Sequence, residues 1–85
     1  MVNLEEISSY LQKGRANEVK ELVQQALNEG MDVKKILEEG LMAGMSIIGE
    51  KFKKNEVYVP EVLIAARAMN AGTALLKPYL VSSGV

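Results

Sequence analysis

Apolar residues recur at helical spacing along four successive segments of the chain. In residues 3–13 they fall on one stripe, and in residues 17–29 they match the i, i+3, i+4, i+7, i+8 pattern of an amphipathic helix. Asn3 can accept a backbone N–H bond at the start of the first segment, and Gly14 and Gly30 can end the two helices because glycine adopts the left-handed conformation without strain. The pattern therefore predicts helices over residues 3–13 and 17–29.

A third helix is predicted over residues 32–53, where Asp32 can cap the first turn. Its interior contains Gly40, Gly44 and Gly49. Each costs about 1 kcal/mol relative to alanine in a helix interior, so three glycines need a physical reason. A missing side chain allows close approach of a neighbouring backbone or of a flat ligand, and we expect helix–helix packing to be the main reason.

The fourth helix is predicted over residues 60–76, after a short loop at residues 55–59. Pro60 suits the first turn, where an N–H has no partner within the helix, and Pro78 is expected to prevent much extension. The chain has no alternating strand pattern, no hairpin turn sequence and no internal repeat. The sequence therefore predicts an all-α fold, a compact four-helix bundle.

The fourth segment is apolar around nearly its whole circumference, although a helix packed on one side of a bundle needs a stripe only a little over about 100° wide. The surplus can be covered by the other three helices, by a second copy of the chain, or by a ligand. The pattern alone does not choose among these. The apolar residues of this segment are Val62, Leu63, Ile64, Ala65, Ala66, Ala68, Met69, Ala71, Ala74, Leu75 and Leu76.

Further apolar residues gather where the third and fourth helices meet. Phe52, the only phenylalanine, stands at the end of the third helix, and Tyr58, Val59 and Val62 stand around the start of the fourth. They can form an apolar platform at one end of the bundle. They can also form a hydrophobic staple, in which side chains beside the cap pack on the first turn, and on the pattern alone the staple is the simpler interpretation.

Composition narrows the possible functions. The 85 residues allow one domain, and a net charge of -1 with a short basic run at residues 51–54 argues against nucleic-acid binding. The chain has no cysteine and no histidine, which excludes disulfides and thiolate metal sites and removes the commonest general base. No serine therefore has a histidine to activate it, and we expect that the chain alone is not an enzyme.

Targeting signals are not expected. The amino-terminal residues include acids where a secretory signal carries positive charge, and the apolar fourth segment is interrupted by Glu61, Arg67 and Asn70. We therefore expect a cytoplasmic protein that does not cross a membrane.

Three motifs in the second half of the chain resemble a known family. They are Gly-Glu-Lys-Phe at 49–52, Val-Pro-Glu-Val at 59–62 and Ala-Ala-Arg-Ala-Met at 65–69. This series resembles the helical cap domain of corrinoid proteins, the methyl carriers of methylamine and methanol methyltransferase systems, and the cap of the cobalamin module of methionine synthase is similar. The resemblance covers nearly the entire chain, with residues 1–80 as the cap and residues 81–85 as the start of a linker.

The resemblance implies a bundle that covers the upper face of cobalamin. The cofactor contacts carried over to this sequence are Phe52, Val59 and Val62, with Tyr58 beside them, so the resemblance favours the platform over the staple. An apolar lid of this kind implies that reduced or methylated cobalt is kept from water, and that the lid opens for a partner methyltransferase. We therefore expect a part in one-carbon metabolism of the methanogenic or acetogenic type.

The family continues into a Rossmann-like cobalamin-binding domain, whose Asp-x-His-x-x-Gly motif supplies a histidine to the cobalt. This chain has neither the motif nor a histidine. We therefore expect that it is the excised amino-terminal domain of a longer corrinoid protein, and that it binds no cobalamin alone although the full-length protein does.

Two other functions stay open. The chain can be a cofactor-free interaction module that forms a homodimer through its surplus apolar surface. It can also be the cap of a cobalamin-based sensor regulator, for which a preceding DNA-binding segment would be expected and none is present.

Overall fold

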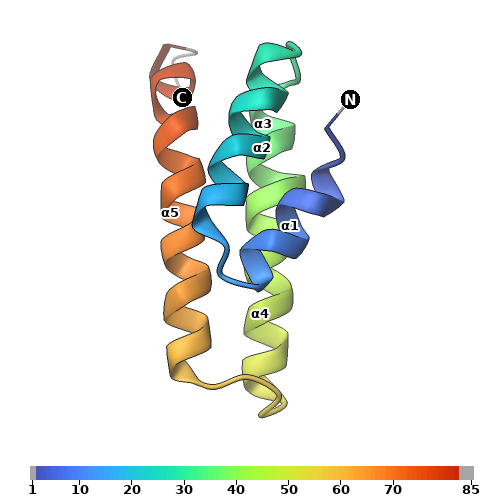
Figure 1. Cartoon of the computed structure of the whole chain (residues 1–85), viewed down its shortest axis with the longest axis vertical. Coiled ribbons are helices and arrows are strands. Elements are labelled where there is room, and N and C mark those ends of the chain that lie inside the picture. The colour runs from blue at the N-terminus through green and yellow to red at the C-terminus, as the bar shows by residue number, and fades with distance from the viewer. Residues whose placement is uncertain (1, 83–85) are drawn as a thin grey trace.

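The computed structural model describes residues 2–82. Within this range α3, the π-helix η1 and α4 follow one another without a break, so four helical rods make up the fold (Figure 1). No described residue lies in a strand. The predicted all-α four-helix bundle is therefore confirmed. The elements are α1 (Leu4–Gln12), α2 (Ala16–Asn28), α3 (Val33–Lys35), η1 (Ile36–Met42), α4 (Ala43–Lys53) and α5 (Val59–Ser82).

Helix ends lie where the capping residues place them. The Asn3 side chain accepts a hydrogen bond from the Glu5 N–H at 2.9 Å, and the Asp32 side chain accepts one from the Lys34 N–H at 3.3 Å. Gly14 and Gly30 follow the ends of α1 and α2 with φ of +72° and +77°, which glycine adopts without strain. The first two helices match their predicted bounds to within one residue at each end.

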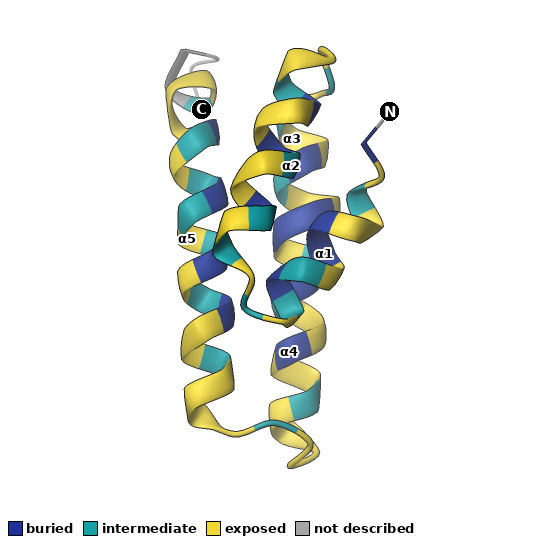
Figure 2. Ribbon diagram, viewed as in Figure 1, coloured by how far each residue is buried: buried dark blue, intermediate teal, exposed yellow. Residues whose placement is uncertain are grey.

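The core lies where all four rods meet (Figure 2). There α2 packs mainly on α5, and α1 packs on η1 and α4. Beyond the corner between α1 and α2, α4 and α5 continue alone to the bottom of Figure 1. We call this part, with its connecting loop, the hairpin. The fully buried side chains of the core include Ile7, Leu11, Val19, Val23, Ile36, Leu41 and Leu76.

Two of the three glycines in the third rod lie against α1. A Cβ built on Gly40 would be 3.2 Å from Cγ2 of Ile7, and one on Gly44 would be 3.1 Å from the backbone oxygen of Ser8. These distances are tighter than ordinary van der Waals contact, so the expected helix–helix packing accounts for both glycines. A Cβ on Gly49 would meet nothing within 4 Å, and helix packing therefore gives no reason for this glycine.

The sequence indicated an uninterrupted α-helix in the third rod, whereas the structure contains the π-helix η1, in which the Ala43 N–H bonds to the Glu38 carbonyl. An α-helix turns about 100° per residue, so each four-residue step drifts about 40° around the axis. A π-helix turns less per residue. The wider turn of η1 reduces this drift. Residues that recur at every fourth position therefore stay on the side of the rod that faces the bundle interior. The buried residues at this spacing are Ile36, Gly40, Gly44 and Ile48.

Pro78 does not end α5, so the prediction that the helix stops near residue 76 was wrong. The helix runs to Ser82 with Pro78 inside it. The missing N–H of Pro78 deprives only the carbonyl of Ala74, and both residues are exposed, so water can satisfy that carbonyl. The expected linker at 81–85 overlaps the end of α5, and its residues 83–85 lie outside the described part.

Replacing Pro78 with alanine is expected to raise the free energy of unfolding by about 1 kcal/mol. Alanine supplies an N–H for the Ala74 carbonyl and has higher helix propensity, while the loss of the proline constraint on the unfolded chain offsets part of the gain. Urea unfolding of this variant and of the exposed control Lys77→Ala measures the difference. A loss of stability in Pro78→Ala alone would contradict a helix that continues through this residue.

None of the helices within residues 2–82 has the length and apolar character needed to cross a lipid bilayer.

Candidate functional site

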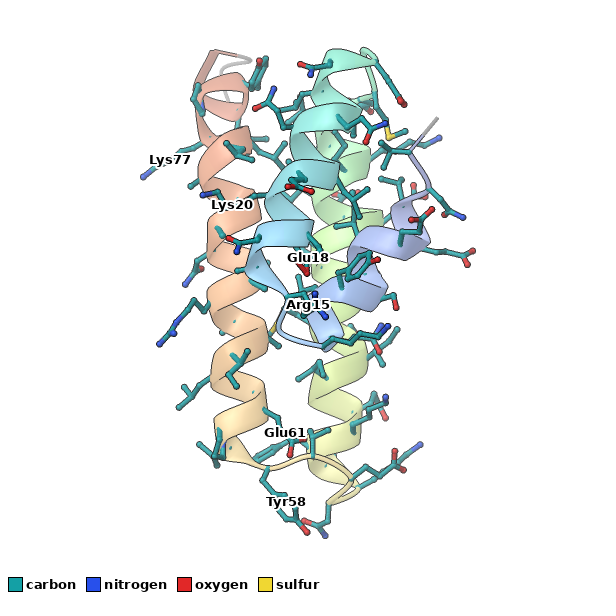
Figure 3. All side chains as sticks on the ribbon, viewed as in Figure 1. Arg15, Glu18, Lys20, Tyr58, Glu61 and Lys77 are labelled. Atoms are coloured by element: carbon teal, nitrogen blue, oxygen red, sulfur yellow. The ribbon has the colours of Figure 1, made fainter. Side chains whose placement is uncertain are left out.

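The structure brings the four predicted site residues to the end of the hairpin. Phe52 lies in the last turn of α4, and Val59 and Val62 lie in the first two turns of α5. Tyr58 precedes α5 and accepts, through its carbonyl, hydrogen bonds from the N–H groups of Glu61 at 3.0 Å and Val62 at 3.2 Å. Figure 3 shows Tyr58 and Glu61 at this end of the bundle.

A tight loop joins the two helices of the hairpin. The Glu56 N–H bonds to the Lys51 carbonyl at 2.8 Å, and the Asn55 N–H bonds to the Phe52 carbonyl at 3.1 Å. Asn55 has a φ of 63°, a left-handed conformation that asparagine adopts more readily than most residues. The loop therefore holds the last turn of α4 beside the first turn of α5.

Three of the four predicted residues are largely exposed. The exposed fractions are 45% for Phe52, 67% for Tyr58 and 55% for Val59, whereas Val62 is half-buried and packs against the core. A hydrophobic staple would bury such side chains against the first turn of the helix. The exposure of Phe52 and Val59 instead leaves apolar surface available to a group outside this chain.

Sequence reasoning missed Leu63, which is 63% exposed and follows Val59 by one helical turn. The sequence pattern places Leu63 only in the surplus apolar surface of the fourth segment. The signal that could have found it is a second stripe on α5. Val59, Val62, Leu63 and Ala66 follow the i, i+3, i+4, i+7 pattern, whereas the buried Ala65 and Ala68 belong to the core stripe.

Helix geometry shows which way the exposed residues of α5 point. A Cβ built on Gly14 would overlap the side chain of Ile64, so Ile64 faces the corner between α1 and α2. Val62 precedes Ile64 by two residues, and Val59 precedes Ile64 by five residues. Val62 and Val59 therefore lie about 160° and 140° around the helix from Ile64, respectively. Val59 and Val62 therefore point away from the α1–α2 corner.

On α4, Gly44 and Gly49 face different directions. Gly44 faces α1, and Gly49 follows it by five residues, about 140° around the helix. Phe52 lies one turn after Gly49, on a neighbouring line of the helix surface. Gly49 of α4 and Val59 and Val62 of α5 thus lie away from α1 and α2, and Phe52, about 80° around α4 from Gly44, lies beside Gly49. We call this surface the open face and define it by Gly49, Phe52, Val59, Val62 and Leu63.

The open face can bind an apolar or planar group but offers no reactive side chain. None of its five residues ionises, and none has an oxygen, nitrogen or sulfur atom in its side chain. Among residues 2–82 no group of three or more acidic, histidine or cysteine side chains is placed to hold a metal ion. The arrangement can therefore exclude water from a surface laid against it without supplying a ligand.

A groove of about 530 Å³ lies at the other end of the bundle, between the start of the third rod and the end of α5. None of the four predicted site residues lines it. Its lining residues are Asp32, Val33, Lys34, Leu37, Glu38, Tyr79 and Leu80.

Known proteins share this sequence pattern. A family described as the B12 binding domain matches residues 4–77. A corrinoid protein of Desulfitobacterium hafniense (strain Y51) is 32% identical over 82 residues, which are 96% of this chain and 38% of the relative. The trimethylamine corrinoid protein of Methanosarcina barkeri is 38% identical over 84 residues, covering 94% of this chain and 39% of the relative.

A solved structure shares the fold. The monomethylamine corrinoid protein of Methanosarcina barkeri superposes with a TM-score of 0.85 at 28% sequence identity, covering 88% of this chain and 35% of that protein. This chain therefore spans less than two fifths of the length of each of these relatives.

Proposed function

The chain belongs to the family of B12 binding domains, and we propose that it is the helical cap over the upper face of cobalamin in a corrinoid methyl-carrier protein. The resemblance inferred from the three motifs is confirmed by the match over residues 4–77. In this proposal residues 1–80 form the cap, the following residues lead to a Rossmann-like cobalamin-binding domain, and the protein works in the cytoplasm with methyltransferases. The names of the corrinoid relatives support the assignment to a methyl carrier.

The observation that carries the proposal is the open face of the hairpin. Phe52, Val59 and Leu63 are each at least 45% exposed although they are large and apolar, and none of the five residues that define this face is charged. Gly49 leaves the α4 surface flat beside Phe52, because no Cβ projects there. An uncharged surface with a flat strip fits one face of a planar corrin ring, whose cobalt carries the transferred methyl group when the cofactor is bound.

The part played by this chain is protection rather than catalysis. The aliphatic side chains of Val59, Val62 and Leu63 and the ring of Phe52 exclude water from whatever surface they cover. They also have no lone pairs with which to compete for the metal. In this proposal the cap moves aside to give a methyltransferase access to the cobalt.

Phe52→Ala is expected to accelerate photochemical loss of the methyl group about tenfold, because a smaller side chain leaves a gap in the lid. The test protein is a chimera in which this chain replaces the corresponding domain of the Methanosarcina barkeri monomethylamine corrinoid protein, loaded with methylcobalamin. The absorbance spectrum under constant illumination gives the rate.

Ile47→Ala is the matched control. Ile47 is also on α4 and is 41% exposed, but it follows Gly44 by three residues and therefore lies toward the α1 side of the helix. We expect the control to leave the photolysis rate unchanged. Equal rates in the unsubstituted, Phe52→Ala and Ile47→Ala chimeras would remove the case for the open face as a lid.

A second copy of the chain is the competing occupant of the open face. Sedimentation of this chain and of the chimera separates the two assignments. Dimers that form in both proteins and that Phe52→Ala dissociates would indicate a self-association surface, whereas a monomeric chimera leaves the face available to the cofactor.

A further inference from the structure

Gly49 is a helix-interior glycine that no contact within the described chain explains. Glycine destabilises a helix interior relative to alanine, so its presence normally reflects a turn, a positive φ or a close approach. Gly49 lies inside α4, is not among the glycines with positive φ, and would have open space around a Cβ. Gly40 and Gly44 of the same rod differ, since a Cβ on either would press against α1.

Gly49 faces away from the packed side of the third rod. It lies about 140° around the helix from Gly44, away from α1, and one turn before Phe52. On α5 the half-buried Val62 and the exposed Val59 point to the same open side of the hairpin. The backbone of α4 is thus bare beside the aromatic ring of Phe52, on the face that carries the exposed apolar residues.

We propose that Gly49 is a contact residue for the cofactor, at which the α4 backbone itself comes against the edge of the corrin ring. This inference rests on the proposed function and adds a residue and a mode of contact to it. A Cβ at this position would project from the helix surface and hold a rigid planar group away from it. The side chain of Phe52 would then no longer reach the ring, although its own surroundings would be unchanged.

A glycine whose backbone contacts a ligand responds to substitution differently from a glycine packed against another helix. Substitution by alanine stabilises the protein alone, because alanine is the better helix former and the space is open. The same substitution weakens ligand contact, because the added methyl group occupies the place of the ligand. A glycine needed for internal packing, such as Gly44, shows the opposite effect on stability.

Gly49→Ala is the decisive variant. In this 85-residue chain we expect the midpoint of thermal unfolding to rise by about 4–8 °C, the shift that corresponds to the helix propensity difference in a domain of this size. In the methylcobalamin-loaded chimera we expect photolysis to become about tenfold faster. Gly49→Leu is expected to accelerate photolysis further, since its longer side chain holds the cap farther from the ring.

Ser9→Ala is the matched control, since Ser9 is exposed on α1 and far along the chain from the hairpin. It also improves helix propensity, and we expect a smaller rise in melting midpoint with an unchanged photolysis rate. This control separates a general effect of helix stabilisation from an effect at the open face.

The outcomes distinguish this inference from the proposed function. Unchanged photolysis in Gly49→Ala, together with faster photolysis in Phe52→Ala, would overturn the role of Gly49 and keep the cap. A lower melting midpoint in Gly49→Ala would also overturn it, because it would reveal an internal reason for the glycine. Unchanged photolysis in both variants would overturn the cap and with it the inference.

Discussion

Leu41→Ala is expected to lower the free energy of unfolding by about 2–5 kcal/mol, the range for truncation of a fully buried leucine. Leu41 lies in η1 with an exposed fraction of 0%, and its Cδ2 atom would be 2.9 Å from a Cβ built on Gly72 of α5. Truncation leaves a cavity between two rods that cannot close up easily, because Gly72 has no side chain to fill it. A domain of this size has a total stability of roughly 4–13 kcal/mol, so the variant loses a large share of it.

Leu63→Ala removes the same atoms from a side chain that is 63% exposed. We expect a change of no more than about 0.5 kcal/mol, as for ordinary surface substitutions. Urea unfolding of both variants, with the slope m checked for constancy, measures the two losses. Comparable losses would mean that Leu63 supports the core, and would remove it from the open face.

Gly44→Val is expected to cost about 3 kcal/mol, because the new side chain meets the backbone of α1. Even the first added carbon would lie 3.1 Å from the Ser8 oxygen and 3.2 Å from the Ser8 Cα. Backbone atoms in the middle of a helix cannot move aside as the end of a flexible side chain can. The two further methyl groups of valine require α1 and α4 to separate.

Gly49→Val is the control for this overpacking. A Cβ at Gly49 would have open space around it, and valine is a slightly better helix former than glycine, so stability is expected to stay equal or rise by a few tenths of a kcal/mol. Thermal and urea unfolding of the two variants give the comparison. A loss at Gly49 equal to that at Gly44 would mean that α4 tolerates no valine at all, whatever its neighbours.

The apolar residues fall into two groups, one buried in the core and one exposed on the surface. Ile7, Leu11 and Leu41 are fully buried and hold the rods together. Phe52 and Leu63 are exposed and are expected to contribute less to stability, so we expect their role to lie in what they contact outside the chain. The second group lies on the hairpin, where only two helices are present to cover it (Figure 2).

Much of the candidate site could be predicted because it depends on neighbours in the chain. Phe52 and Val59 are separated by a short loop, so any hairpin of helices brings them to one end of the bundle. Leu63 could not be separated from the core leucines in the same way. Spacing along α5 shows that Leu63 and the core alanines lie on different stripes, but which stripe is buried depends on where α2 lies beside α5.

The path of the chain through η1 and Pro78 could not be predicted either. Both features depart from the regular α-helical hydrogen-bond pattern, and their cost depends on what surrounds the affected carbonyls. The exposed position of Ala74 makes the lost bond of Pro78 tolerable. Packing of Gly40 and Gly44 on α1 favours the wider turn that keeps their row inside the bundle.

Local residue patterns are thus sufficient to specify four helical rods, their caps and the end of the bundle where apolar side chains gather. The reason is that capping and helical periodicity act over a few residues of a continuous chain. Which apolar residues are buried, and which glycine is bare, depends on contacts between segments far apart in sequence. Only the packed arrangement of α1 and α2 against α4 and α5 leaves Gly49, Phe52 and Leu63 uncovered.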